Sequence, residues 1–487
     1  MSKSISKNII FKFLLNIFNV VVPIIIGPYV LRVLGPDLMG TVNFSQTIYG
    51  YFFIFAGFGV YQYGLREISR VRDNKNKLSQ VFTSLFILTM ITNIVTTLFY
   101  IVFIKISYSG TEIYVACMIL TFNLLSNIFY TEWVNEGLEN YDFITVKTII
   151  IRVAYIILLF IFVKSTSNFK EYMILLVLST FLNNIASFLH IKKRIPFNLK
   201  GIKLAKHVKP MFLVVILSNA NILYTQLDRY FIGRYINMDS VAYYTMSQNI
   251  SNIINSLLMT VITVTIPRMS NYISNESHEE YESLLNKIAK MYFIILFPAA
   301  IGLFVLAKEV IIIYGGYKYL EAIPILQVFS IYIITLGYEM ILSNQVMYVK
   351  GKEKEQVKFN FIGGAVNFVG NIFLLFSGIF NGTNAVITTM IANIIVVILE
   401  YVYIKAVLKL DFNIFGFDKT KYLIISLLFI PITEFISKFR FETLLFTLVS
   451  ILVNSIVYFG ILLLIKDENL LEALNKFLEK MKIDKKI

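Results

Sequence analysis

Long apolar segments separated by short polar stretches recur along the whole chain, and this pattern predicts membrane-spanning helices. A helix needs about 20 predominantly apolar residues to cross a bilayer. The segments that meet this criterion lie at 9–31, 41–63, 79–104, 113–134, 145–164, 172–190, 210–232, 241–266, 290–313, 323–347, 359–379, 383–404, 421–437 and 442–465. The pattern therefore predicts an all-α integral membrane protein of about 14 helices, and an even number places both chain ends on one side.

The second half of the chain repeats polar positions of the first half after 202 residues. The aligned charged and amide residues are Arg32 with Arg234, Asp37 with Asp239, Gln46 with Gln248, Asn19 with Asn221, and Arg66 with Arg268. Duplicated membrane halves that rock against each other around a central site are typical of secondary transporters. We therefore expect two pseudo-symmetric six-helix bundles.

The expected organisation of the chain follows from this repeat. The predicted parts are an N-terminal six-helix bundle at 1–190, a basic cytoplasmic linker at 191–209, a C-terminal six-helix bundle at 210–404, two further helices at 405–465 and a tail at 466–487. In the tail, apolar residues recur at helical spacing with Lys and Glu between them. That spacing indicates an amphipathic helix on the cytoplasmic surface rather than another span.

Composition supports a membrane protein and gives its orientation. Of 487 residues 57% are hydrophobic, and the mean hydropathy of +0.72 is too high for a chain that must cover its surface with polar groups. The net charge is +14; 33 Lys and Arg residues, Lys147 among them, fall on the side shared with the termini and 10 on the other. Basic residues are retained in the cytoplasm, so both termini are expected there, and the charge indicates no nucleic-acid partner.

Few residues offer catalytic or metal-binding chemistry. Cys117 is the single cysteine, and the three histidines lie far apart in sequence, so we expect no metal site, no cofactor and no Ser–His–Asp triad. A phosphate-binding loop has the form GxxxxGK[ST], but around Gly351–Lys352 the chain has Val346 and Glu353 at the other required positions. The predicted outer loops are too short for a catalytic domain. An enzyme or ATP-driven pump is therefore not expected.

Polar side chains inside the predicted helices are the remaining candidates for a binding site. The amide and hydroxyl residues that could line a wet cleft and bind sugar hydroxyls are Asn221, Thr225, Gln248, Asn252 and Asn255. Their spacing places several of them on one helix face. The alternative is that they form hydrogen bonds between helices.

Charged residues within the spans carry a stronger signal, since each costs about 2.5–3.5 kcal/mol at the bilayer centre on insertion scales. Arg152 lies in the fifth predicted span, and Asp228 and Arg229 lie near the outer end of the seventh. Glu339 lies about a third of the way along the tenth, counted from its cytoplasmic end. A buried carboxyl group can bind a coupling ion, so Asp228 and Glu339 are the candidates. Glu132 and Glu400 fall near inner helix ends and are expected at the membrane interface.

Several stretches together resemble one family of transporters. They are GPYVLRVLGPDLMGTVNFSQT at Gly27–Thr47, YGLREISRVRDN at Tyr63–Asn74, EWVNEGLENYDFITVKTIIIRV at Glu132–Val153, FPAAIGL at Phe297–Leu303 and NQVMYVKGKEKE at Asn344–Glu355. Their order and spacing are similar to those of Wzx-type oligosaccharide flippases. These form the polysaccharide transporter branch of the multidrug/oligosaccharidyl-lipid/polysaccharide exporter superfamily. The resemblance extends to about Leu410, and the last two helices match only in number.

The resemblance implies a MATE-like fold with a cationic cleft. It also implies that undecaprenyl-diphosphate-linked oligosaccharide repeat units pass through this cleft by alternating access while the lipid tail stays in the bilayer. A diphosphate needs charge-assisted hydrogen bonds from arginine, and the available candidates are Arg32, Arg152, Arg229 and Arg234. The implied partners are protons or Na⁺, membrane lipids, and the polymerase and assembly proteins of O-antigen or capsule synthesis. The implied location is the bacterial cytoplasmic membrane.

Three other functions remain open from the sequence. A multidrug or metabolite cation antiporter of the same fold would be expected to place acidic residues in the first bundle, where the spans offer Arg152 and the peripheral Glu132. A lipid II flippase differs only in its substrate, and the Trp133–Glu139 loop separates it weakly. A membrane polysaccharide polymerase would need a long outer loop carrying catalytic residues, and the pattern predicts none.

Overall fold

Helices form all the regular structure in the described part of the computed structural model, which covers residues 5–472, 474, 475 and 479. Within these ranges some helical side chains, including those of residues 217–225, are outside what the structure describes. The chain divides into two compact units, Met1–Thr245 and Met246–Ile487. The all-α fold predicted from the sequence is confirmed.

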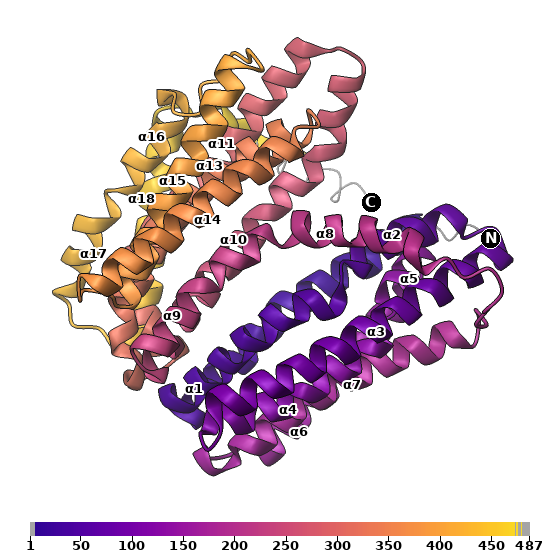
Figure 1. The fold of residues 1–487 in the computed structure, drawn as a ribbon. Coiled ribbons are helices and arrows are strands. Elements are labelled where there is room, and N and C mark those ends of the chain that lie inside the picture. The colour runs from indigo at the N-terminus through magenta and orange to yellow at the C-terminus, as the bar shows by residue number, and fades with distance from the viewer. Residues whose placement is uncertain (1–4, 473, 476–478, 480–487) are drawn as a thin grey trace. The chain divides into compact units, whose positions relative to one another are not determined.

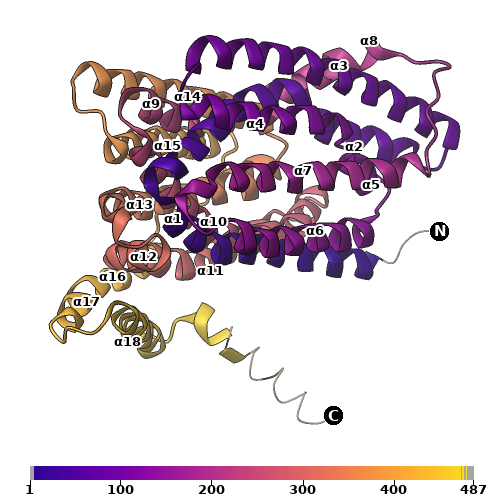
Figure 2. The same cartoon turned by 90° about the horizontal axis from the view of Figure 1, so that it is seen from below.

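The first unit is built around helices that run side by side (Figures 1 and 2). Its elements are α1 (Ile5–Gly57), α2 (Val60–Val71), α3 (Lys75–Tyr108), α4 (Glu112–Ser126), the 3₁₀ turn η1 (Asn127–Phe129), α5 (Glu132–Gly137), α6 (Tyr141–Phe162), the 3₁₀ turn η2 (Thr166–Asn168), α7 (Phe169–Lys192), α8 (Leu204–Thr225), α9 (Leu227–Tyr235) and the start of α10 (Met238–Ser274). The long helices α1, α3, α4, α6 and α7 pack on one another, and α2 and α5 pack against each other.

Helix α1 is broken at Gly35, whose φ of 78° and ψ of 175° are not helical. Before the break α1 runs parallel to α6, because Thr145 hydrogen-bonds to Phe11 and Tyr29 hydrogen-bonds to Val163. Residue numbers thus rise together along both helices. The N-terminal half of α1 therefore has the same direction as α6.

After the break α1 runs antiparallel to α3. Asn93 hydrogen-bonds to Ala56, and Tyr108 contacts Phe44, so residue numbers fall along one helix as they rise along the other. Helix α4 returns between α3 and α6, so these two helices share a direction. The chain thus reverses at Gly35, and the predicted spans 9–31 and 41–63 are two separate passes.

The second unit contains the rest of α10 and the helices that follow it. These are α11 (His278–Val305), α12 (Ala307–Tyr314), the 3₁₀ segment η3 (Tyr317–Ala322), α13 (Ile323–Met340), the π-helix η4 (Ile341–Tyr348), α14 (Glu353–Phe376), α15 (Gly382–Ala406), α16 (Phe417–Ser426), α17 (Phe429–Ser437) and α18 (Thr443–Leu464). Helix α13 packs between α11 and α15, and α14 covers α15. Helices α16 and α17 pack on α11, and α18 packs on α12 and α17 (Figure 2).

The surface of both units is that of a multi-pass membrane protein. Large apolar side chains such as Ile106, Phe376 and Leu464 are at least 80% exposed, which is unfavourable in water and suits contact with lipid. Twelve helical segments of the described chain are long and apolar enough to cross a membrane. The first of them, Ile17–Val71, contains both passes of α1, and the predicted span 210–232 falls on α8 and α9, which are not among the twelve. The number of 14 spans stays a prediction.

Candidate functional site

The four arginines predicted to bind a diphosphate all lie in the first unit, on α1, α6 and α9. Arg32 and Arg234 are exposed, and Arg152 and Arg229 are half-buried. Arg152 donates a hydrogen bond to Asn19 Oδ1 on the N-terminal half of α1. An amide oxygen positions the guanidinium group without cancelling its charge, so Arg152 keeps the properties of an anion-binding residue.

Helix α9, which carries Arg229 and Arg234, packs against the C-terminal half of α1. The ring of Tyr230 stacks on Phe44 with centroids 5.9 Å apart. A Cβ atom on Gly233 would come within 2.3 Å of the Phe44 ring, so α9 and α1 are in close contact. Because the two arginines are five positions apart, they project about 140° apart around the helix. The structure therefore places them on one element but on different faces.

Asp228 is fully buried beside this arginine pair. Its Oδ2 accepts a hydrogen bond of 2.7 Å from the Tyr244 hydroxyl of α10. The contact fastens α9 to α10, which gives the carboxylate a structural role. Its predicted role in binding a coupling ion stays a prediction.

The predicted glycan-binding amides fall into two groups. The side chains of Asn221 and Thr225 lie outside the described residues, although their backbone belongs to α8. On α10, Gln248 and Asn255 are half-buried and Asn252 is exposed. The buried Oδ1 of Asn255 has no hydrogen-bond partner within the described chain. At least this amide has an acceptor available for a ligand.

Two buried carboxyl groups lie between α13, η4 and α15 in the second unit. Glu339 and Glu400 are 4% and 0% exposed. Glu339 accepts a hydrogen bond of 2.5 Å from Asn393 Nδ2, and Glu400 accepts one of 2.6 Å from Ser343 Oγ. Glu400, which was expected at the membrane interface, is packed between α15, η4 and α13; its depth in the membrane stays a prediction. Burying two carboxylates without a compensating cation or proton is costly, so this pair suits reversible ion binding.

The π-helix η4 next to this pair was not predicted from the sequence. Within it, Gln345 Nε2 donates hydrogen bonds to the Ile262 carbonyl (2.8 Å) and to Thr265 Oγ1 (2.9 Å) of α10. The Gln345 carbonyl, in turn, accepts a 2.8 Å hydrogen bond from the Tyr281 hydroxyl of α11. Short π-helical segments inside α-helices are frequent at functional sites. No periodicity of apolar residues distinguishes such a segment from an ordinary helix, so the sequence carried no signal for it.

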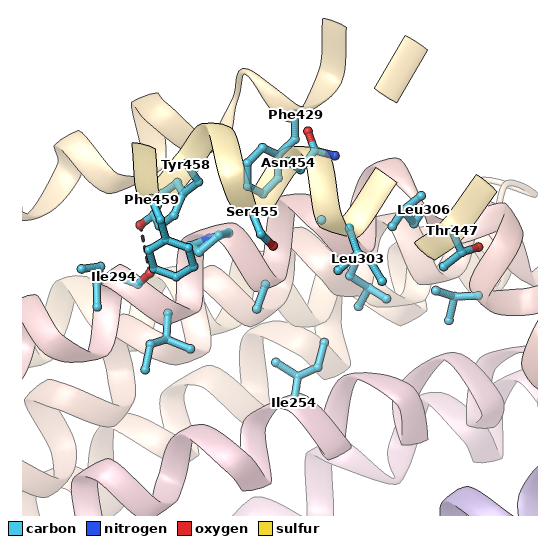
Figure 3. A pocket seen from close by; sticks show the side chains of 16 residues that line it. Ile254, Ile294, Leu303, Leu306, Phe429, Thr447, Asn454, Ser455, Tyr458 and Phe459 are labelled. Carbon is cyan, nitrogen blue, oxygen red and sulfur yellow. Dashed lines mark hydrogen bonds between the residues drawn. The ribbon is translucent and has the colours of Figure 1, made fainter. Parts of the chain in front are cut away.

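The second unit also contains an apolar groove of about 400 Å³ between α11 and the C-terminal helices (Figure 3). Its walls come from α10, α11, α12, α17 and α18. Three of the polar lining residues form hydrogen bonds within the protein. Tyr458 donates to the Ile294 carbonyl and Thr447 donates to the Thr443 carbonyl. Asn454 donates to Thr433 Oγ1. The groove therefore presents mainly carbon atoms and suits an apolar chain. It was not predicted from the sequence.

Comparison with known proteins decides the family of the chain. A family model described as polysaccharide biosynthesis protein matches residues 5–273, which is more than half of the sequence. The chain belongs to this family of polysaccharide biosynthesis proteins. The family resemblance predicted from the sequence is confirmed, and the match contains all of the arginine candidates but ends before α11.

Two curated relatives are similar over most of their length. A "Putative O-antigen transporter" of Escherichia coli (strain K12) is 22% identical over 422 residues, which is 82% of this chain and 97% of the relative. A "Putative O-antigen transporter" of Shigella dysenteriae is 24% identical over 369 residues, covering 74% of this chain and 91% of the relative. Both are named as transporters rather than as enzymes.

Solved structures agree with the expected fold. The inward closed conformation of lipid II flippase MurJ superposes with a TM-score of 0.73 at 18% identity, covering 93% of this chain and 97% of that one. An inward-facing multidrug resistance MATE family transporter of the MOP superfamily gives a TM-score of 0.59 at 16% identity, covering 82% and 96%. At these identities the likeness shows a common fold. The predicted MATE-like architecture is thus confirmed.

Proposed function

We propose that this protein is a flippase that moves undecaprenyl-diphosphate-linked oligosaccharide repeat units from the inner to the outer leaflet of the bacterial cytoplasmic membrane. The product serves the assembly of a surface polysaccharide such as O-antigen or capsule. Both termini are cytoplasmic in this proposal, in agreement with the distribution of basic residues. The movement is alternating access of the two halves.

The observation that carries the proposal is the apolar groove in a member of a polysaccharide biosynthesis family. Free sugars and sugar nucleotides have no need of a groove lined by carbon atoms. A sugar carried on a long isoprenoid chain does, because each buried CH₂ group contributes about 0.8 kcal/mol. The groove lies within α10–α18, on helices whose outer faces carry large exposed apolar residues. In this proposal the lipid chain occupies the groove while the polar head crosses.

The polar head is assigned to the charged and amide residues of the spans. Arg32, Arg152, Arg229 and Arg234 bind the diphosphate, and the amides of α8 and α10 bind the glycan. Glu339 is a better candidate for the coupling ion than Asp228, because Glu339 shares a buried site with a second carboxyl group. A proton or Na⁺ bound there in one state would cancel one of the two negative charges, and its release in the other state would restore that charge. Polymerase and assembly proteins act on the exported product.

The alternatives predict different substrates for the same fold. A lipid II flippase also needs an apolar groove, so the groove does not separate the two, and the names of the relatives favour a surface-polysaccharide repeat unit. A multidrug antiporter takes soluble cations and gives no reason for membership of a polysaccharide biosynthesis family. The polymerase alternative lacks support, because both relatives are named transporters.

The proposal is tested by locating the lipid-linked oligosaccharide in cells that lack the protein. An impermeant reagent that labels glycans is applied to intact cells and to opened cells. We expect intact repeat units to accumulate and only the opened cells to be labelled. Label on intact cells with no elongation would place the protein after translocation, and an unchanged lipid-linked pool would favour the antiporter; either result contradicts the proposal.

A further inference from the structure

A small cavity of about 260 Å³ opens in the first unit where α1 meets α2. The chain turns there through Phe58 and Gly59, both with positive φ (44° and 70°). The cavity wall includes the aromatic rings of Tyr61 and Tyr130 and the amide of Gln62. We call this cavity, together with the adjoining Glu136, the Tyr61 pocket.

The two tyrosines form one wall of the Tyr61 pocket. Their ring centroids are 6.5 Å apart and the rings are tilted by 36°. The Tyr61 hydroxyl donates to both carboxylate oxygens of Glu136, at 3.1 and 3.0 Å. Donation to a charged acceptor polarises the phenol oxygen and makes it a better acceptor for a further donor. The wall therefore offers apolar ring faces with a strong hydrogen-bond acceptor at one end.

Buried contacts hold this wall in place from behind. The indole nitrogen of Trp133, a residue 1% exposed, donates a 3.1 Å hydrogen bond to the Tyr130 carbonyl. Asn127, which also lines the cavity, donates through Nδ2 to Asn93 Oδ1 at 3.0 Å. Asn93 is fully buried and donates to the Ala56 carbonyl of α1. The pocket is thus built on fixed groups, and a ligand would pay little ordering cost.

The chemistry of the pocket distinguishes among the parts of a lipid-linked glycan. A pyranose ring presents C–H groups on its faces and hydroxyl groups around its edge, which match aromatic rings, Gln62 and the polarised Tyr61 oxygen. The Glu136 carboxylate repels a diphosphate. Phe53, Ile54 and Val60 make part of the wall apolar, but a lipid chain would use neither the Gln62 amide nor the Tyr61 oxygen beside them. The cavity is smaller than the roughly 300–1,000 Å³ of drug-sized sites, which fits one ring. We propose that the Tyr61 pocket binds a single uncharged sugar ring of the substrate.

The position of the pocket gives this binding a place in transport. The pocket lies at the end of the second pass of α1, next to the basic segment Arg66–Lys77 that is expected in the cytoplasm. The repeat unit is present on that side before translocation. The inference rests on the proposed function and deepens it. The first unit binds one sugar of the glycan when the substrate enters from the cytoplasmic side.

The protein carries its own reporter for this site, because Trp133 is the single tryptophan of the chain and contacts Tyr130 directly. The full-length protein in detergent is titrated with undecaprenyl-diphosphate-linked repeat units extracted from the host, and in parallel with undecaprenyl diphosphate. We expect a saturable change in tryptophan fluorescence with the first lipid and little or none with the second. An equal response to both lipids would show that the pocket does not bind sugar.

Variants then test the wall itself. Tyr61→Leu and Tyr130→Leu remove the ring faces, and each is expected to weaken binding of the glycan-bearing lipid about tenfold. Tyr61→Phe keeps the ring and loses only the hydroxyl, so it separates lost binding from misfolding and should weaken binding less. Tyr114→Leu on α4, a partly buried tyrosine outside the pocket, is the matched control. Wild-type affinity in both leucine variants would overturn the proposal.

The same variants are compared in cells by the intact-cell labelling assay. If export of the repeat unit requires the protein but is unchanged by Tyr61→Leu and Tyr130→Leu, the proposed function stands and the sugar pocket is wrong. If export does not require the protein at all, the proposed function itself fails, whatever the fluorescence shows. Slower export in the pocket variants at normal protein levels, with Tyr114→Leu unaffected, supports both.

Discussion

At the scale of single residues, Asp467 shows how one carboxylate joins the segment after α18 to α16. Its Oδ1 accepts hydrogen bonds of 3.1 Å from the backbone amides of Asn469 and Leu470 and so caps the helical turn that follows. Its Oδ2 accepts from Lys421 and from the Tyr422 hydroxyl of α16. Only 2% of Asp467 is exposed. One side chain thus caps the start of a helical turn and pairs with a half-buried lysine.

Replacing Asp467 by Asn tests the charge of this contact while keeping an acceptor for the cap. Burial alone would raise the pKa of Asp467, but hydrogen bonds from Lys421, the Leu470 amide and Tyr422 outweigh it and lower the pKa. We expect Asp467→Asn to destabilise the protein by about 1–2 kcal/mol at neutral pH. Because the pKa is lower in the folded state, this stabilisation is complete above the unfolded value of about 3.9 and is lost as pH falls through the folded value.

Thermal unfolding of the purified protein and the variant over this pH range is the measurement. The difference in melting temperature between them should be largest near neutral pH and should shrink below about pH 4. A difference that stays constant with pH would mean that the Asp467 charge contributes nothing and that the variant acts through packing.

The residue scale is also where sequence reasoning was weakest. Lys147 counted among the basic residues of the inner side, but the structure buries it on α6, with 8% of the residue exposed. Its Nζ donates to both carboxylate oxygens of Glu132 and to Ser187 Oγ of α7. Periodicity shows that a residue lies on a helix, but the partner that allows a charge to be buried comes from another helix. Only the tertiary contacts show that pairing.

At the scale of elements, the reversal within α1 depends on a backbone conformation that glycine alone adopts readily. Gly35 has φ 78° and ψ 175°, and a Cβ atom there would meet nothing within 4 Å. The cost of Gly35→Ala is therefore conformational, about 1–3 kcal/mol. A Cβ atom added at Gly57 in the same element also meets nothing within 4 Å, but Gly57 does not have a positive φ. Gly57→Ala is therefore the matched control. Thermal unfolding should show destabilisation for Gly35→Ala only; equal melting temperatures would contradict the strained reversal.

Elements of ordinary length and period were predicted well, and irregular ones were not. Residues 79–104, 145–164 and 383–404 were expected as spans and correspond to α3, α6 and α15, with shifts of up to several residues at their ends. The π-helix η4 sits inside the predicted span 323–347, and its apolar pattern is that of a continuous helix. Hydrophobic periodicity shows which face of a helix is buried, so it predicts regular helices. It does not show where the backbone hydrogen bonds change locally from the α-helical to the π-helical pattern.

At the scale of the whole molecule, the sequence predicted the family and the helical architecture but not the shapes between helices. The groove combines α10 and α11 with α17 and α18, helices more than 100 residues apart in the chain. Each of these helices reads as an ordinary apolar span. Which helix faces remain uncovered depends on how the helices pack within the unit. That packing cannot be derived from the apolar pattern of a single sequence. The Tyr61 pocket was missed for the same reason.

The groove itself can be tested by filling it. Gly302 lines the groove, and a Cβ atom added there meets nothing within 4 Å, so Gly302→Leu adds a side chain to empty space rather than to a packed core. A leucine would displace several CH₂ groups of a bound lipid chain, each contributing about 0.8 kcal/mol. We therefore expect translocation of the lipid-linked repeat unit to slow about tenfold, measured by intact-cell labelling at matched protein levels.

Gly460→Leu on α18 is the control, because that glycine has equally open surroundings but does not line the groove. If both variants transport at the wild-type rate, the lipid chain does not bind in the groove. If both variants are slow, a larger side chain slows transport at either position, and the effect is not specific to the groove. Loss of transport in Gly302→Leu alone would show that an apolar chain must enter this groove for the polar head to cross. That result would separate a carrier of lipid-linked substrates from a multidrug antiporter of the same fold, which transports small soluble cations.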